Sequence, residues 1–125
     1  MAENNNFSIS YRDHDNIKII DITGHLDAYT ANELEQAMYD VIQNGGYKII
    51  VNFSKLDYIS SAGLGVFMAF IEEVRNKDGD IKLASMTSKV YSVFDLLGFP
   101  MLFEIDKDEK KLIEKFTNAS SDDQK

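Results

Sequence analysis

Apolar and polar residues alternate with two different periods along this chain. Stretches with a period of two predict strands, and apolar stripes that recur about every three or four residues predict helices. The predicted strands are residues 7–11, 17–22, 47–53, 81–84 and 101–105, and helices are predicted from about residues 30, 61, 89 and 106. The resulting order β-β-α-β-α-β-α-β-α predicts the α/β class, with a mixed β-sheet of about five strands, partly parallel, covered by about four α-helices.

The first two predicted strands are joined by a polar turn at residues 13–16 and should form a hairpin. The sequence Thr-Ala-Asn-Glu at 30–33 has the pattern of a capping box. In that arrangement the Thr30 hydroxyl accepts a hydrogen bond from the backbone N–H of Glu33, and the Glu33 carboxylate accepts one from the N–H of Thr30. The helix that follows is expected to end at the glycine pair 45–46, where left-handed backbone geometry is easily adopted.

The middle of the chain predicts a buried strand followed by a long helix. The succession Ile-Ile-Val at 49–51 is typical of a central strand that is covered on both faces. A loop over 54–60 is expected to lead into a helix at 61–76. The residues expected on the core side of this helix are Leu64, Phe67, Met68, Ile71 and Val74.

The last third of the chain predicts two more helices around a strand. The helix at 89–97 is expected to place Leu97 on its core face and to end at Gly98, and Pro100 prevents its continuation. The final helix is expected to open at 106–109, after the strand 101–105.

Length and composition indicate one domain. A chain of 125 residues with 44% hydrophobic residues can bury a single core. We expect one domain over 1–125, with a core at about 7–116 and a flexible polar tail at 117–125. The chain has no cysteine, no apolar N-terminal segment and no long apolar run, so we expect a cytoplasmic protein without membrane insertion.

The net charge of −8 argues against direct nucleic-acid binding, which needs clustered Lys and Arg. It also disfavours an anionic membrane surface and is consistent with protein partners that carry basic patches. His14 and His25 lack the spacing of metal ligands, so no metal site is expected. The chain has no phosphate-binding loop and no Ser–His–Asp spacing, so we expect no cofactor and no enzymatic activity.

The most informative segment is Ser60-Ser61-Ala62-Gly63-Leu64-Gly65-Val66, where a loop turns into a helix. A serine at this point can cap the helix, and the free N–H groups of the first turn can equally hold a phosphate on that serine. Glycine early in a helix costs on the order of 1 kcal/mol relative to alanine. The two glycines therefore indicate close approach of either another segment of this chain or a partner.

This segment, after the strand 49–53, resembles the signature of STAS domains, including the bacterial anti-sigma-factor antagonists. The segment Thr-Gly-His-Leu-Asp at 23–27 resembles the family's Gly-x-Leu-Asp loop before its first helix. The pattern Val-x-x-x-Phe-x-x-Leu-Gly-Phe at 90–99 resembles its third helix and glycine stop. The resemblance covers roughly residues 7–116, with all elements in family order, and implies the STAS fold.

In the antagonist family the motif usually reads Asp-Ser-Ser/Thr-Gly-Leu-Gly, and its first hydroxyl residue is phosphorylated. Aligned on Gly-Leu-Gly, Ser61 takes the phosphoacceptor position, and Ser60 is a poorer match to it. Ser60 stands where the family has Asp, and Ala62 stands where it has a second Ser or Thr.

The resemblance implies a partner-switching cycle. The unphosphorylated domain would bind an anti-sigma factor, a serine kinase of the histidine-kinase-like ATPase fold, and so release a sigma factor. The kinase would phosphorylate Ser61, and a metal-dependent serine phosphatase would reset the system. The residues expected at the partner-binding surface are His25, Asp27, Asp57, Ser60, Ser61, Gly63, Leu64, Val66 and Phe70. Val66 and Phe70 lie off the core stripe and are either buried by neighbouring elements or an apolar docking surface.

Three alternatives stay open. In the first, the chain is a STAS module of another assembly, such as a stress-signalling scaffold or a lipid-transport ATPase complex, without a sigma-factor role. In the second, it is a small enzyme that binds a substrate phosphate at the Ser61 helix end, which a deep pocket beside Ser61 would favour. In the third, it is a plain interaction domain without phosphorylation.

Overall fold

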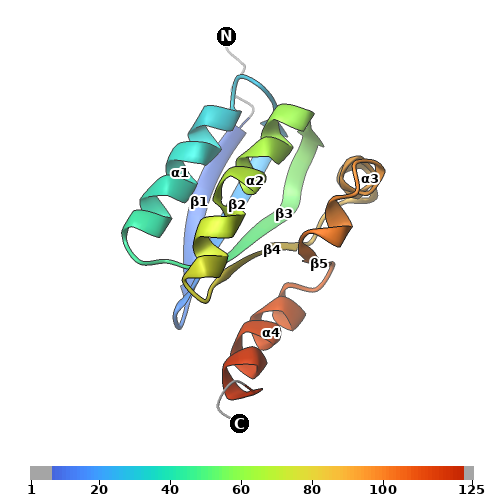
Figure 1. Ribbon diagram of the computed structural model, residues 1–125. Helices are drawn as coiled ribbons and strands as arrows, with labels where there is room; N and C mark the ends of the chain where they lie inside the picture. Colours follow the sequence, from blue (N-terminus) through green and yellow to red (C-terminus); the bar gives the residue numbers. More distant parts are fainter. Residues whose placement is uncertain (1–6, 123–125) are drawn as a thin grey trace.

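The computed structural model describes residues 7–122 and contains one five-stranded mixed sheet (Figure 1). The strands follow one another across the sheet in chain order. β1 is antiparallel to β2, and the remaining neighbours are parallel, so the predicted hairpin and the predicted mixed sheet are both confirmed. The strands are β1 (Phe7–His14), β2 (Ile17–Leu26), β3 (Lys48–Ile59), β4 (Asp80–Ala84) and β5 (Glu104–Asp106).

The predicted element order is also confirmed, with one short 3-10 helix added, η2 (Phe99–Met101). The α-helices are α1 (Ala31–Gln43), α2 (Ser61–Asn76), α3 (Ser88–Leu96) and α4 (Glu109–Asp122). α1 and α2 lie side by side against one face of the sheet and begin at the same edge of it (Figure 1).

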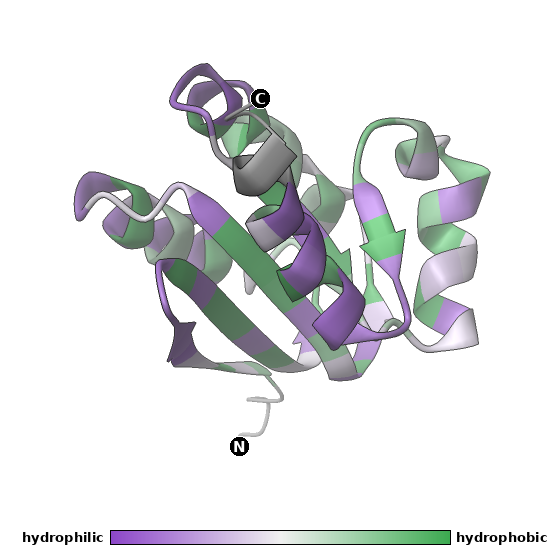
Figure 2. Ribbon diagram, turned by 90° about the horizontal axis from the view of Figure 1, so that it is seen from below, coloured by the Kyte–Doolittle hydropathy of each residue, from purple (hydrophilic) through white to green (hydrophobic). Residues whose placement is uncertain are grey.

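Two apolar clusters hold these layers together. Buried residues of α1, α2 and α3 pack with Ile49 and Val51 of β3 in the larger cluster. Ile50, between them, belongs to the smaller cluster with Leu112 and Phe116 of α4. Because successive side chains of a strand point to opposite faces, β3 is covered on both sides, as predicted. The central strands are largely apolar, whereas the helices carry polar bands (Figure 2).

The two central strands are longer than predicted. Residues 54–59, expected to be a loop, continue β3, and 24–26 continue β2. The two extensions pair through register shifts between Asp21 and Thr23 and between Gly24 and His25. These irregularities break the simple alternation of apolar and polar positions, and the prediction depended on that alternation.

The segment after α3 also differs from its prediction. The last strand is present but begins later than predicted: residues 99–101 form η2, and β5 covers 104–106 in place of 101–105. Gly98 has a positive φ of 77°, and Met101 is 88% exposed. The expected core positions Leu97 and Met68 are 50% and 44% exposed. Residues 117–122 continue α4, in contrast to the expected tail, and residues 1–6 and 123–125 lie outside the described residues.

Candidate functional site

Ser60 and Ser61 lie where β3 ends and α2 begins, at the carboxyl end of the parallel strands. The backbone N–H of Ser60 donates to the carbonyl of Leu26 over 2.9 Å. This bond places the β3–α2 junction directly beside the loop that leads from β2 into α1. The carboxyl ends of parallel strands are the usual place for binding sites in open α/β sheets.

Ser61 is the first residue of α2 and is exposed, and its side chain has no hydrogen-bond partner in residues 7–122. The first backbone hydrogen bond of the helix runs from the N–H of Leu64 to the carbonyl of Ser60 (3.2 Å). The N–H groups of Ser61, Ala62 and Gly63 therefore remain outside the hydrogen bonding of the helix. An anion at the Ser61 hydroxyl would meet these donors and the positive end of the helix dipole.

Ser60 occupies the N-cap position, but its side chain makes no capping hydrogen bond. Its Oγ is buried and has no hydrogen-bond partner among the described atoms. Plain capping by this serine is therefore not what the structure shows. Without a side-chain cap, the first turn of α2 keeps its donors available at the surface next to Ser61.

The two glycines of α2 have different surroundings. A Cβ built on Gly63 would lie 2.7 Å from Leu26 Cγ and 3.1 Å from the Leu26 carbonyl oxygen. At Gly65, in contrast, nothing lies within 4 Å of the added carbon. The close approach predicted from the sequence is therefore explained at Gly63 by this chain's own β2, and Gly65 faces open space.

Three of the apolar residues expected at the partner surface are buried. Leu64 and Val66 are 1% and 6% exposed, and Gly63 packs against Leu26. Phe70 is half-buried and packs against the main core. Of the two alternatives left open for these residues, the structure shows burial for Val66, whereas Phe70 keeps part of its surface accessible. The outward face of α2 instead presents Ser61, Ala62, Gly65, Met68 and Ala69.

The β2–α1 loop is held by Asp27 and Thr30 rather than by the predicted capping box. The Thr30 hydroxyl accepts from the N–H of Asp27 and contacts the carbonyl of His25, both over 2.9 Å. Asp27 Oδ1 accepts from the N–H groups of Tyr29 (2.9 Å) and Thr30 (3.1 Å). The capping box is wrong because the Thr30 side chain turns back to Asp27, and the N–H of Glu33 donates to the Thr30 carbonyl.

The remaining predicted residues lie at the same edge of the sheet. His25 pairs with Tyr58 across β2 and β3, and their rings make an edge contact with centroids 5.9 Å apart. Asp57 is exposed on β3. Within residues 7–122, Asp27 and Asp57 take part in no ion pair, so this edge is acidic and uncompensated.

Sequence reasoning missed two aromatic residues at this edge. Tyr58 is 45% exposed, and Tyr29, in the β2–α1 loop, is 91% exposed. Both tyrosines could have been found from the sequence, because a large aromatic residue in a predicted loop has no core position in the apolar pattern.

A network of charged side chains lies elsewhere and links α4 to β1 and β2. Arg12 donates to both oxygens of Asp21 (2.6 and 2.7 Å) and of Glu109 (2.8 and 3.1 Å). The hydrogen bonds from Arg12, opposed by burial and aided by a bond from Asn52, lower the pKa of Glu109 below its ordinary value. Both carboxylates raise the pKa of Arg12. This network anchors the first turn of α4 to β1 and β2.

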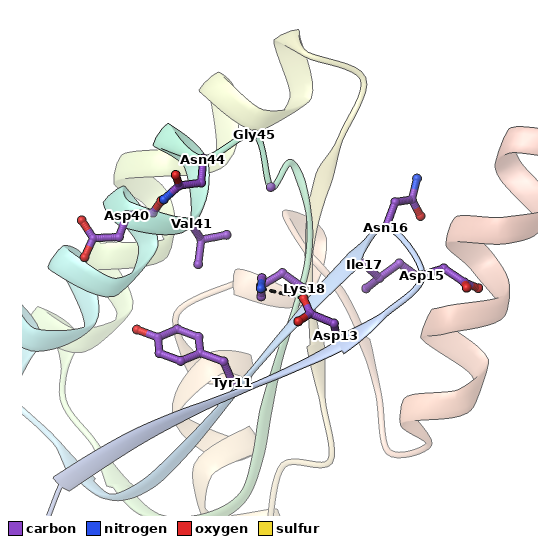
Figure 3. Close-up of a pocket in the computed structure, with 11 residues that line it drawn as sticks. Tyr11, Asp13, Asp15, Asn16, Ile17, Lys18, Asp40, Val41, Asn44 and Gly45 are labelled. Atoms are coloured by element: carbon purple, nitrogen blue, oxygen red, sulfur yellow. Dashed lines mark hydrogen bonds and ion pairs between the residues drawn. The ribbon is translucent and has the colours of Figure 1, made fainter.

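A cavity of about 550 Å³ lies at the opposite end of the sheet, between the β1–β2 hairpin and the end of α1 (Figure 3). It includes the Lys18–Asp13 ion pair (2.6 Å) on the hairpin side and Asp40 on the helix side. Neither Ser61 nor Asp27 contributes to its lining.

Residues 7–122 contain neither a metal-binding cluster nor a membrane-spanning helix. No group of three or more His, Asp or Glu side chains there is arranged to hold a metal ion. No helix in that part of the chain is both long and apolar enough to cross a membrane.

Comparison with known proteins agrees with this arrangement. The STAS domain family model matches residues 8–112, and the chain therefore belongs to the STAS domain family. One relative is an anti-sigma-B factor antagonist of Staphylococcus epidermidis, 26% identical over 102 residues, which cover 82% of this chain and 94% of the relative.

Solved structures support the fold. An anti-sigma factor antagonist from Mycobacterium paratuberculosis aligns with a TM-score of 0.79 at 18% identity, over 92% of this chain and 97% of that one. The anti-sigma factor antagonist SpoIIAA in its unphosphorylated form aligns with a TM-score of 0.75 at 20% identity, over 89% and 97% of the two chains. SpoIIAA of Bacillus in its phosphorylated form aligns with a TM-score of 0.64 at 20% identity, over 86% and 97%.

Proposed function

We propose that this protein is an anti-sigma factor antagonist controlled by phosphorylation of Ser61. In its unmodified form it binds an anti-sigma factor that is a serine kinase of the histidine-kinase-like ATPase fold, and a sigma factor is thereby released. Phosphorylation of Ser61 by this kinase ends the complex, and a metal-dependent serine phosphatase restores the hydroxyl. The family and the names of the relatives support this role.

The observation that carries the proposal is the free hydroxyl of Ser61 at an uncapped helix N-terminus. The hydroxyl is exposed and unpaired in the described structure, so a kinase can reach it. A phosphate there adds about −1.5 to −2 charges and three acceptor oxygens. The unused N–H groups of the first turn can receive those oxygens, so the fold tolerates the modification.

The cost of phosphorylation then falls on the complex. A partner surface fitted to a serine hydroxyl meets a bulky dianion, and Asp27 and Asp57 at the same edge make the local potential more negative still. The protein needs no catalytic group of its own for this role, because the kinase and the phosphatase perform the chemistry.

The decisive experiment combines intact mass and site mapping of the protein from its native cells with affinity capture. We expect one added phosphate, located on Ser61, and capture of an ATPase-fold kinase by the unmodified form only. Ser61→Asp should lose this partner, whereas Ser60→Ala should keep it. An unmodified Ser61 under every growth condition, or a Ser61→Asp variant that binds as tightly as the wild type, would refute the switch.

A second candidate is a STAS module of another assembly, such as a stress-signalling scaffold or a lipid-transport complex, without a sigma-factor role. The observation that favours it is the departure from the antagonist motif, with Ser60 in place of Asp and Ala62 in place of Ser or Thr. Capture of a scaffold or transporter subunit in place of the kinase would establish this alternative.

A further inference from the structure

Tyr29 is the most exposed of the large apolar side chains in the described structure, with 91% of its surface accessible. An exposed aromatic side chain leaves a large apolar area in water, and such residues mark interaction sites when they occur on rigid elements. Tyr11 and Tyr39 are about half exposed, at 50% and 51%. Tyr29 therefore stands out even among the exposed tyrosines of this chain.

The backbone that carries Tyr29 is held by local hydrogen bonds. Asp27 Oδ1 accepts from the N–H of Tyr29 and from the N–H of Thr30, and the Thr30 hydroxyl bonds to both Asp27 and His25. These hydrogen bonds link four residues before α1: His25, Asp27, Tyr29 and Thr30. A tyrosine presented on a fixed loop loses little conformational entropy when it binds, because only two side-chain torsions must be ordered.

The loop that carries Tyr29 begins next to the β3–α2 junction, where Ser61 lies. The N–H of Ser60 is bonded to the carbonyl of Leu26, and Tyr29 follows Leu26 by three residues. Gly63 packs on Leu26, so Leu26 lies between the β2–α1 loop and the first turn of α2. A partner that covers Ser61 and the small outward residues of α2 therefore meets the β2–α1 loop as well.

The charges around Tyr29 define the partner's chemistry. Asp27 precedes Tyr29 in the loop, Glu33 lies in the first turn of α1, and Asp57 lies near the end of β3. None of the three forms an ion pair within the described residues. Lys and Arg side chains are attracted both to such carboxylates and to the face of an aromatic ring. A pocket with an apolar floor and a basic rim satisfies both the ring and its acidic surroundings.

We propose that Tyr29 is the aromatic anchor of the Ser61 interface, inserted into an apolar pocket of the partner that is rimmed by Lys or Arg. The proposal rests on the proposed function, because the partner is the anti-sigma factor kinase that docks at Ser61. In this proposal the partner is recognised by Tyr29 in the β2–α1 loop, whereas the phosphate is carried by Ser61 in α2. Phosphorylation and recognition then use separate parts of one surface.

A photo-crosslinking experiment in native cells tests the assignment. Benzoylphenylalanine replaces Tyr29 in one variant, Gly65 in a second and Tyr39 in a third, and the adducts are identified by mass spectrometry. We expect an ATPase-fold kinase crosslinked from positions 29 and 65 but not from 39, with the site on the kinase next to Lys or Arg residues. Capture of the kinase from position 65 without position 29 would overturn the anchor and leave the proposed function intact. No ATPase-fold protein at either position would overturn both.

The captured kinase, once purified, serves as the probe for a binding titration. Tyr29→Ala should weaken binding by about tenfold or more, as for aromatic hot spots, whereas the matched control Tyr39→Ala should change it less than about twofold. Tyr29→Phe should recover most of the affinity because the ring is kept. Thermal unfolding should be unchanged in all three, since these side chains are exposed. Equal affinities of Tyr29→Ala and wild type would refute the anchor even if Ser61→Asp still abolishes binding.

Discussion

Two glycines of one helix turn allow a residue-scale test of packing. Gly63→Ala places a methyl group 2.7 Å from Leu26 Cγ and 3.1 Å from the Leu26 carbonyl oxygen. Overpacking of this kind costs about 1–3 kcal/mol, which exceeds the helix-propensity gain of roughly 1 kcal/mol. Gly65→Ala keeps the gain without a clash, since nothing lies within 4 Å. In urea denaturation followed by circular dichroism, Gly63→Ala should lower and Gly65→Ala should raise the free energy of unfolding. A stable Gly63→Ala variant would show that Leu26 moves away easily.

Ser60 gives a second residue-scale prediction. Replacing an N-cap serine by alanine normally costs about 1 kcal/mol, because a hydrogen bond to the first turn is lost. Here the Ser60 Oγ is buried without a partner, so its removal also relieves an unsatisfied group. We expect Ser60→Ala to change the free energy of unfolding by less than about 0.5 kcal/mol. A loss of 1 kcal/mol or more in urea denaturation would mean that Ser60 caps α2 in solution.

At this scale, the sequence predicted the positions of Ser60 and Ser61 but not their environments. The end of α1 at the glycine pair and the start of α2 could be predicted because local residue preferences decide them. The burial of Val66 could not, since it depends on which neighbouring helix lies against that side of α2. Likewise, the Thr30 hydroxyl could bond either to the N–H of Glu33 or to Asp27. It bonds to Asp27 because the chain bends after β2, and the sequence pattern does not show that bend.

At the scale of elements, the attachment of α4 predicts a pH dependence. Glu109 is the first residue of α4, and its hydrogen bonds from Arg12 lower its pKa below the ordinary value of 4.5. A carboxylate whose pKa is lower in the folded state stabilises the fold above its unfolded pKa, and this stabilisation is lost as the pH falls through the folded value. Glu109→Gln should therefore cost about 1 kcal/mol at pH 7 and progressively less below about pH 4.5.

The measurement is urea denaturation of wild type and Glu109→Gln at pH 7 and at pH 3. Glu114→Gln is the matched control, because Glu114 is exposed on the same helix and has no partner in the described structure. The difference between wild type and Glu109→Gln should shrink at low pH, and the control should show none at either pH. A pH-independent difference would assign the effect of Glu109 to packing rather than to its charge.

The elements also show where prediction from the sequence fails. α2 was predicted with its observed bounds, because its apolar stripe is long and its ends carry clear signals. The carboxyl-terminal half of β3 was missed because residues 54–58 are mostly polar and exposed, and their strand conformation is imposed by pairing with β2. The start of the last strand, predicted at residue 101 and observed at 104, was misplaced for a similar reason. Its apolar residues satisfy the local pattern, but Met101 is exposed and only 104–106 find a partner in β4.

For the whole molecule, the arrangement of layers could be predicted from the order of elements. The distribution of charge over the surface could not be predicted without the structure. Parallel strands connected through helices leave the starts of α1 and α2 at one edge, as Figure 1 shows. The net charge of −8 could be counted from the sequence. That Asp27 and Asp57 meet uncompensated at the same edge as Ser61 depends on the pairing of β2 with β3.

This charge distribution predicts the salt dependence of partner binding. Asp57→Lys and Glu114→Lys each change the net charge from −8 to −6, because −1 becomes +1 in both. Only Asp57 lies at the edge of Ser61, whereas Glu114 lies on α4, which packs on the opposite face of the sheet. If the partner is basic, local complementarity should govern the association rate, and total charge should matter less.

Asp57→Lys should slow association with the captured kinase severalfold at low salt and abolish most of its salt dependence, while Glu114→Lys should associate nearly as fast as wild type. Stopped-flow kinetics at about 50 and 300 mM salt, roughly 14 and 6 Å in Debye length, separate the two cases. Equal slowing by both substitutions would mean that only the net charge attracts the partner, and a rate unchanged by either would rule out a basic partner surface.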